Sequence, residues 1–258
     1  MMNLFIIIFS LFISGYVISL IYFSILTDRY NSKTSDNLFS ISVIISLHNE
    51  EKNVQHLMQS LLAQKYPKDQ IEFIFVNDRS VDKTGNLLDS YSKEDSQITV
   101  IHITKKQKNI APKKFAIDSA INIAKGEIIL FTDADARHDK EWAKTMTSYF
   151  TEKVGMVLGN VTYNTNRKIK SLLFRLVHLD FFSISAIGLS TVSMKYPATC
   201  IGTNMAVRKK VYEELGGYGK YKNIQSGDDD LLMQRVRDEG DWEIEYATDK
   251  RATVFTFP

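Results

Sequence analysis

The feature that most constrains the fold is a series of nearly continuous apolar runs that alternate with helix-like segments. The apolar runs span residues 41–46, 71–76, 98–103 and 127–131. Apolar residues at helical spacing, or helix-forming composition, mark residues 54–62, 82–92 and 113–126. Strands that are apolar on both faces are typical of a parallel sheet covered by helices on both sides. The sequence therefore predicts an α/β fold with a doubly wound, mostly parallel sheet.

Polar residues stand where these strands end. They are His48, Asn49 and Glu50 after the first strand, Asn77 and Asp78 after the second, and Asp133 and Asp135 after the fourth. In open α/β sheets, ligands bind beyond the carboxyl ends of the strands, so we expect a site at this edge. The glycine-rich dinucleotide and phosphate-loop motifs are absent from the sequence. A nucleotide bound here would need carboxylates and a metal ion in place of a glycine loop.

Asp133 and Asp135 are separated by a single alanine directly after an apolar strand. Residues two apart in an extended segment point the same way, and two like charges this close repel each other unless a cation lies between them. Carboxylate oxygens suit a hard divalent cation, Mg²⁺ or Mn²⁺. The alternative interpretation is a solvated aspartate turn, which is common. One such pair does not decide between the two.

Two further charged clusters each have two interpretations. Lys113 and Lys114 precede a helix and either contact a diphosphate or belong to a solvated face. Asp228, Asp229 and Asp230 open a helix and are either site residues or first-turn acids that complement the helix dipole. The dipole and the free N–H groups at this position predict that Asp229 is kept ionised and only weakly basic.

The N-terminal segment, residues 4–25, contains no charged residue and reaches the about 20 residues that a membrane-spanning helix needs. The pattern of a cleaved signal peptide is absent. Arg29 and Lys33 follow the apolar run, and the positive-inside rule then places the chain from residue 27 onward in the cytoplasm. We expect a single-pass membrane anchor over residues 1–26 and a juxtamembrane linker over residues 27–40.

Charge and cysteine content exclude several classes of protein. The formal net charge is +2, with acids and bases nearly balanced, which argues against a nucleic-acid partner. A single cysteine, Cys200, excludes an internal disulfide framework and a cysteine-rich zinc site. A second apolar stretch, residues 179–189, is too short to span a bilayer. It is expected to be a core helix or a helix lying against the membrane surface.

Five short motifs occur in a fixed order. They are "SVIISLHNEEKNV", "FVNDRSVDKTG", "AKGEIILFTDADA", "GTNMAVRKKVYEELGGY" and "GDDDLL". Together they resemble the family-2 glycosyltransferases of the GT-A fold, and the resemblance covers roughly residues 40–257. It implies a catalytic domain over residues 41–258. The nucleotide-sugar half is expected at about 41–140 and the acceptor half at about 141–258.

The resemblance implies roles for the residues on the donor side. Glu50 and Asp78 match positions that hold the uracil and ribose of a nucleotide-sugar, with a UDP-sugar as the expected donor. Asp133 and Asp135 match the D-x-D motif, in which Asp135 ligates the metal that bridges the diphosphate and Asp133 assists. Lys113 and Lys114 are the expected donor-binding cations.

On the acceptor side, the resemblance implies that Asp229 is the catalytic base. Asp228 stands where the family's acid pair usually has Glu, so the choice of base between Asp228 and Asp229 stays open. Asp228, Gly217 and Tyr218 are expected on the acceptor side. One base opposite the leaving group predicts a single displacement with inversion, onto a glycan or lipid-linked acceptor, in cell-surface glycan or glycolipid synthesis.

The sequence also departs from the family pattern. The Q-x-x-R-W motif of processive members is absent, and the sequence stops at "VFTFP". A short nonprocessive enzyme or a truncated chain would both explain this ending, and truncation is favoured. Two other functions stay open, a non-catalytic nucleotide-sugar-binding protein and a nucleotidyltransferase. The latter would carry a glycine-rich basic signature near its first strand, which "SLHNEEKN" does not supply.

Overall fold

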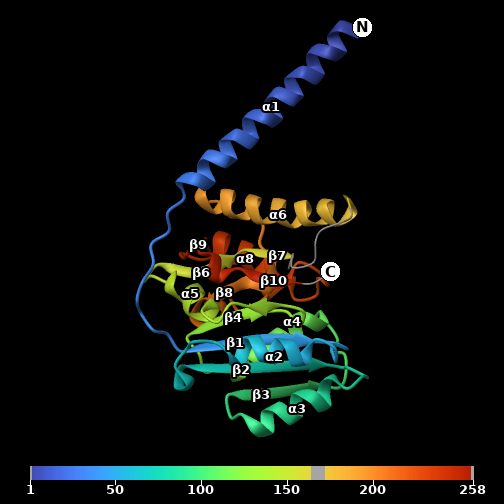
Figure 1. The fold of residues 1–258 in the computed structure, drawn as a ribbon, viewed down its shortest axis with the longest axis vertical. Coiled ribbons are helices and arrows are strands. Elements are labelled where there is room, and N and C mark those ends of the chain that lie inside the picture. The colour runs from blue at the N-terminus through green and yellow to red at the C-terminus, as the bar shows by residue number, and fades with distance from the viewer. Residues whose placement is uncertain (1, 164–171, 257–258) are drawn as a thin grey trace.

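A seven-stranded sheet organises the protein in the computed structural model, which describes residues 2–163 and 172–256 (Figure 1). Its strand order is β3-β2-β1-β4-β8-β6-β9. The strands are β1 (Ile41–Leu47), β2 (Ile71–Asp78), β3 (Ile98–Ile103), β4 (Ile128–Thr132), β6 (Val154–Gly159), β8 (Met205–Arg208) and β9 (Glu243–Ala247). The sequence ending at Phe257 and Pro258, and the start of the helix predicted over 169–188, lie outside the described residues.

Helices cover both faces of this sheet, as the apolar strands predict. One core cluster joins the sheet to α2 (Val54–Leu62), α3 (Thr84–Glu94) and α5 (Trp142–Ser148). The opposite cluster joins it to α4 (Pro112–Ile123), α7 (Lys209–Glu214) and α8 (Asp228–Glu239). Only β8 runs antiparallel to its neighbours, β4 and β6. The predicted α/β class with a mostly parallel sheet is confirmed.

A small second sheet has the order β5-β10-β7, formed by β5 (Arg137–His138), β10 (Val254–Thr256) and β7 (Val161–Tyr163). The sequence predicts one strand over residues 155–163, and this prediction is wrong, because β6 and β7 belong to different sheets. The break is at Asn160, whose carbonyl accepts a hydrogen bond from the side chain of buried Asn204 at 2.8 Å. A Cβ on Gly159 would lie 2.3 Å from the same Asn204 amide, so the chain passes tightly around that side chain.

Two long helices lie at one end of the protein. α1 (Met2–Arg29) projects away from the body, and α6 (Leu172–Ser193) lies across the same end (Figure 1). Among the described residues, one segment, Ile6–Arg29, is long and apolar enough to cross a membrane. The apolar part of α6, Phe181–Ser193, is shorter, as predicted.

Tyr30 ties the end of α1 to the large sheet. Its hydroxyl donates a hydrogen bond to the Glu245 carboxylate and accepts one from the backbone N–H of Tyr246 at 2.8 Å. Burial and the Glu245 carboxylate raise the pKa of Tyr30 well above its usual value, so the phenol stays protonated and keeps donating. These two hydrogen bonds therefore fix the end of α1 to β9.

His138 fastens the small sheet to its surroundings. Its Nδ1 lies 3.1 Å from the Ser60 hydroxyl on α2, its Nε2 lies 2.8 Å from the Thr132 hydroxyl, and its ring packs 4.4 Å from that of Trp142. Burial, together with the nearby Arg137 guanidinium, lowers the pKa of His138 to about 3. The imidazole is therefore neutral in the folded protein and holds the segment that follows Asp135.

We predict that acid destabilises the protein through His138. In the unfolded chain its pKa is about 6.5, so the unfolded state takes up the proton first as the pH falls. Neutral His138 makes its full contribution to the free energy of unfolding above about pH 6.5. This contribution is lost progressively toward pH 3, at up to about 1.4 kcal/mol per pH unit. Urea unfolding in detergent at a series of pH values measures this slope. His138→Gln should flatten it, whereas His56→Gln, at an exposed position on α2, should leave it unchanged.

Candidate functional site

Lys113 joins two acidic segments that are far apart in the sequence. Its ammonium lies 3.4 Å from Asp133 Oδ1, after β4, and 3.2 Å from Asp228 Oδ2, at the start of α8. Burial lowers the pKa of Lys113, but the Asp133 and Asp228 carboxylates outweigh burial and raise it overall. The lysine therefore stays charged, and the D-x-D segment and the acidic run belong to one site at the carboxyl edge of the sheet.

The D-x-D residues lie in a turn, because β4 ends at Thr132 and β5 begins at Arg137. The predicted extended geometry of Asp133 and Asp135 is therefore wrong, and contacts from distant segments orient the two carboxylates. Asp133 accepts a hydrogen bond from the Thr203 hydroxyl, and Asp135 accepts one from the Thr256 hydroxyl at 2.6 Å.

These two aspartates fit a shared cation. The part of the chain that the structure describes contains no group of three or more His, Cys, Asp or Glu side chains placed to hold a metal alone. Each carboxylate has acceptor capacity beyond its threonine bond. Mg²⁺ is usually held by one or two protein carboxylates together with substrate phosphates and water. The donor set at Asp133 and Asp135 is of this kind.

Asp229 is a half-buried carboxylate at the first turn of α8. Its Oδ2 accepts a hydrogen bond from the Gly202 N–H at 2.8 Å, and its Oδ1 accepts one from the Asp230 N–H at 2.9 Å. Burial raises the pKa of Asp229, the two N–H groups lower it, and the adjacent Asp228 and Asp230 carboxylates raise it further. The net shift is upward, so the carboxylate is more basic than an ordinary aspartate, and the expectation that the dipole leaves it only weakly basic is wrong.

The three consecutive acids have different partners. Asp228 pairs with Lys113, and Asp229 accepts from Gly202. Asp230 accepts from the Cys200 N–H at 2.9 Å and the Thr199 hydroxyl at 3.2 Å. Consecutive helical residues point in different directions. Asp230 therefore fixes the 199–202 loop. Asp228 faces Lys113, and Asp229 faces the backbone of the loop.

The ends of β1 and β2 form the neighbouring part of the site, since Leu47 pairs with Asn77 in the parallel register. Asp78 receives two hydrogen bonds from the Arg79 guanidinium, at 2.6 and 2.8 Å. Glu50 Oε2 accepts from the Asn53 amide at 2.8 Å.

Backbone conformation also marks this edge as unusual. Asn49 and Arg79 adopt left-handed φ angles of 58° and 57°. Non-glycine residues in this region cost free energy and cluster at functional sites. The Val81 N–H donates to Asn49 Oδ1 at 2.8 Å, and the Asn49 N–H donates to the Ser80 hydroxyl at 2.9 Å. These bonds between the two strand ends hold the strained turns in place.

Lys114 does not face the acids. Its ammonium is buried and donates to the carbonyls of Tyr221 at 3.2 Å, Ile224 at 2.6 Å and Ser226 at 3.4 Å. The predicted donor contact of Lys114 is therefore not supported. The side chain instead organises the loop that leads into Asp228.

Tyr218 and Gly217 also differ from expectation. The Tyr218 ring is buried, lies 5.9 Å from the Tyr212 ring, and has Lys114 Nζ 5.4 Å from its centroid. Gly217 has a left-handed φ of 61°, and its carbonyl accepts from Arg235. A direct acceptor contact of Tyr218 is not supported, and both residues shape the turn after α7.

The sequence did not single out the residues that orient the acids. Gly202 and Thr203 fall within a quoted motif, but nothing in their spacing indicates that they contact Asp229 and Asp133. Thr256 lies 121 positions from Asp135 and carries no local signal at all.

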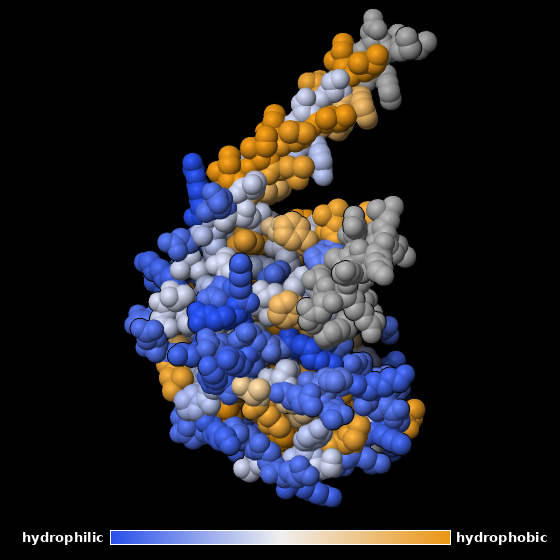
Figure 2. Space-filling model, in the orientation of Figure 1, coloured by the Kyte–Doolittle hydropathy of each residue, from blue (hydrophilic) through white to orange (hydrophobic). Residues whose placement is uncertain are grey.

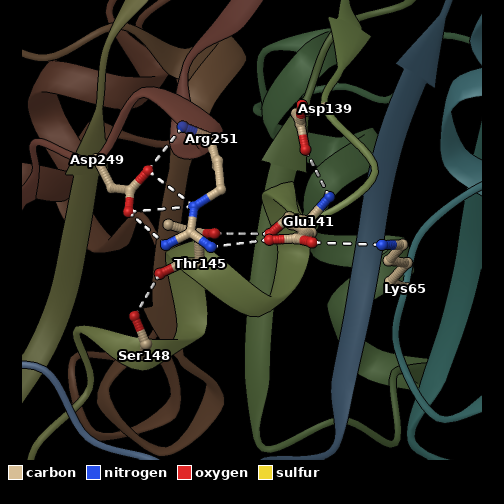
Figure 3. Close-up of polar contacts among 7 residues, drawn as sticks. All are labelled: Lys65, Asp139, Glu141, Thr145, Ser148, Asp249 and Arg251. Carbon is tan, nitrogen blue, oxygen red and sulfur yellow. Dashed lines mark hydrogen bonds and ion pairs between the residues drawn. The ribbon is translucent and has the colours of Figure 1, made fainter.

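A separate cavity of about 380 Å³ lies under the juxtamembrane linker. Figure 3 shows its charged side chains paired with one another: Glu141 lies 3.4 Å from Lys65 and 2.8 Å from Arg251, which lies 2.6 Å from Asp249. This network joins α5 to the turn at Lys250–Ala252 and leaves the acids and bases satisfied. By contrast, Lys113, Asp133 and Asp228 line a hollow of about 10 Å³, which is room for about one water molecule. The acids and the lysine singled out in the sequence therefore lie at the smaller hollow and not at the larger cavity.

Comparison with known sequences identifies the family to which this chain belongs. The model for "Glycosyl transferase family 2" matches residues 42–216, more than half of the chain. "Probable glycosyltransferase YdaM" of Bacillus subtilis is 32% identical over 187 residues, which is 69% of this chain and 42% of the relative. Glycosyltransferase GlyG of Streptococcus pneumoniae is 25% identical over 204 residues, covering 76% of this chain and 64% of the relative. The chain thus spans less than two thirds of either relative.

Solved structures share the fold. The mannosyltransferase PcManGT from Pyrobaculum calidifontis, in complex with GDP-Man and Mn²⁺, superposes with a TM-score of 0.73 at 18% identity, covering 95% of this chain and 66% of that one. Residues 1–349 of Staphylococcus aureus TarS, in complex with UDP-GlcNAc, superpose with a TM-score of 0.59 at 20% identity, covering 85% and 58%. The fold is GT-A-like, and with the sequence match over residues 42–216 the chain belongs to glycosyltransferase family 2.

Proposed function

We propose that this protein transfers a sugar from a UDP-sugar to an acceptor hydroxyl, with inversion and with a divalent cation, in cell-surface glycan or glycolipid synthesis. The observation that carries the proposal is the Lys113 ammonium between Asp133 and Asp228, which unites the D-x-D segment and the acidic run in one site. A TarS structure that contains UDP-GlcNAc and the PcManGT complex with GDP-Man and Mn²⁺ support a nucleotide-sugar donor.

On the donor side, Glu50 and Asp78 hold the nucleoside at the ends of β1 and β2. Asp135, with Asp133, would hold Mg²⁺ or Mn²⁺, which would supply positive charge to the diphosphate leaving group. Lys113 supplies a second positive charge on the same side, fixed in place before the reaction.

On the acceptor side, Asp229 takes the proton of the attacking hydroxyl. A half-buried carboxylate with a raised pKa is a stronger base than an ordinary aspartate. The Gly202 and Asp230 N–H groups fix its two oxygens, so the base is held in position before the acceptor arrives. Attack on the sugar from the face opposite the leaving diphosphate gives an inverted product.

The base assignment predicts that Asp229→Asn loses transfer by about 10²- to 10⁴-fold. Asparagine keeps the shape and removes the basicity, so UDP affinity should stay near that of the unmodified protein. Its single acceptor oxygen keeps only one of the two N–H bonds, so the free energy of unfolding should fall by about 1 kcal/mol. Because the pKa of Asp229 is raised, the acid limb of the rate profile should lie above the ordinary aspartate value of about 3.9. Transfer rates measured as a function of pH, with UDP binding by calorimetry, test both statements.

Asp228→Asn and Asp230→Asn serve as controls for the base. Each should reduce transfer much less than Asp229→Asn, because Asp228 pairs with Lys113 and Asp230 holds the 199–202 loop. Equal losses at all three positions would assign the acids a structural role. Full activity in Asp229→Asn would exclude this residue as the base.

The cation assignment predicts that Asp135→Asn weakens UDP binding in the presence of Mn²⁺ and leaves the weak binding in chelator unchanged. The carboxylate supplies a charged oxygen ligand that the amide replaces poorly. Asp89→Asn is the matched control, since Asp89 pairs with His102 on the exposed side of α3. Calorimetric titration with UDP measures the three proteins with Mn²⁺ and with chelator, and equal affinity in the two conditions for the unmodified protein would contradict the assignment.

We also propose that α1 anchors the protein in a membrane with the catalytic domain in the cytoplasm. The uncharged helix and the basic residues Arg29 and Lys33 after it support this arrangement. Full-length protein should fractionate with membranes and need detergent for extraction, whereas a version that begins at Tyr30 should be soluble. Starting there retains the Tyr30 contacts with Glu245 and Tyr246. Full-length protein that stays in solution without detergent would refute the anchor.

A further inference from the structure

The outer face of α6 carries large apolar side chains that are exposed on the surface of the described protein. Their exposed fractions are 54% for Leu176, 57% for Leu179, 63% for Phe182 and 46% for Ile187. Their spacing places them on one side of the helix. Grouped apolar surface of this kind costs free energy in water and marks an interaction site.

The opposite face of α6 packs on the protein. Ser185 and Val192 are buried, and the Phe181 ring lies 4.8 Å from that of Tyr163 on β7. α6 also contacts β9. A helix held along one side by two strands cannot cross a bilayer, so only its outer face is free to meet another surface.

The position of α6 indicates what that surface is. α6 packs beside α1, and both lie at the same end of the protein (Figure 1). Figure 2 shows apolar surface along α1 and again on α6 next to it. Tyr30 fixes the end of α1 to β9, which α6 also contacts. A bilayer that contains α1 therefore lies beside the outer face of α6.

Charged and amphipathic side chains follow the apolar row at the C-terminal end of α6. Lys195 and Tyr196 are exposed, and the Arg237 guanidinium lies 4.3 Å from the centroid of the Tyr196 ring. Tyrosine and long basic side chains at the edge of an apolar surface are typical of the headgroup region of a membrane. Lys195 pairs with Glu245 at 3.6 Å and Arg237 with Asp238 at 2.6 Å, so the apolar row, and not free positive charge, provides the contact.

We propose that α6 is a second membrane contact, which lies in the plane of the bilayer with its outer face among the lipids and its inner face on the catalytic domain. This settles the alternatives left by the sequence, because one side of the helix is core and the other is membrane surface. The inference rests on the anchor proposed above, and its test is separate from that of the anchor.

The test places single tryptophans in the full-length protein, as Leu179→Trp and Phe182→Trp. Ile123→Trp is the matched control, since Ile123 is exposed to 46% on α4, which packs on β1, β2 and β3 rather than on β9. Each variant is reconstituted in vesicles of phosphatidylcholine and phosphatidylglycerol, with and without bromine on the acyl chains. Subtracting the unmodified protein removes the signals of Trp142 and Trp242.

We expect bromine to quench most of the added emission at positions 179 and 182, with a blue shift, and to leave position 123 unaffected. Protein that stays in the vesicles with no more quenching at 179 and 182 than at 123 would overturn the proposal while leaving the anchor intact. Shielding of the two tryptophans from iodide without bromine quenching, together with a dimer in detergent, would assign the face to a second copy of the chain. That outcome would overturn the proposal as well.

Discussion

The site depends on one ammonium group held between two carboxylates. Lys113 lies within ion-pair distance of both Asp133 and Asp228, and without it the acids of β4 and α8 would repel each other across the edge of the sheet. The pair of contacts joins the half of the protein that carries the first strands to the half that carries α8. A single positive charge thus keeps the D-x-D turn beside the start of α8, and in the proposed reaction it would also stabilise the departing diphosphate.

Backbone and hydroxyl groups of one loop position the acids around Lys113. Gly202 donates to Asp229, Cys200 donates to Asp230, and Thr203 donates to Asp133. The same loop reaches Asn204, which is buried and separates β6 from β7. Residues 199–204 therefore both separate the two sheets and position the acids. A substitution among them would alter the position of three carboxylates at once. The raised pKa of Asp229 follows from this enclosure, because burial outweighs the N–H groups that favour the charged form.

The sequence predicted β1, β2, β3 and β4 well, because residues apolar on both faces have few alternatives to a covered parallel sheet. It also predicted that Asp133 would lie at the carboxyl edge, and it left Lys113 and Asp228 open between site residues and a solvated face or helix cap. It failed where the outcome depends on contacts between distant segments. The burial of Lys114 against three carbonyls, the Thr256 contact with the D-x-D turn and the split at Asn160 have no signature in local spacing. The expected weak basicity of Asp229 failed for the same reason, since desolvation is set by packing and the helix dipole is only one contribution.

The Tyr30 contact restricts how α1 is placed relative to the rest of the protein. A hydroxyl that both donates to Glu245 and accepts from Tyr246 leaves little freedom between α1 and β9. With α1 in a bilayer, as proposed, Lys113 and Asp229 lie at a fixed height above the membrane plane. In the proposed reaction, a lipid-linked acceptor would reach Asp229 only if the length between its attachment point and its reactive hydroxyl spans that height.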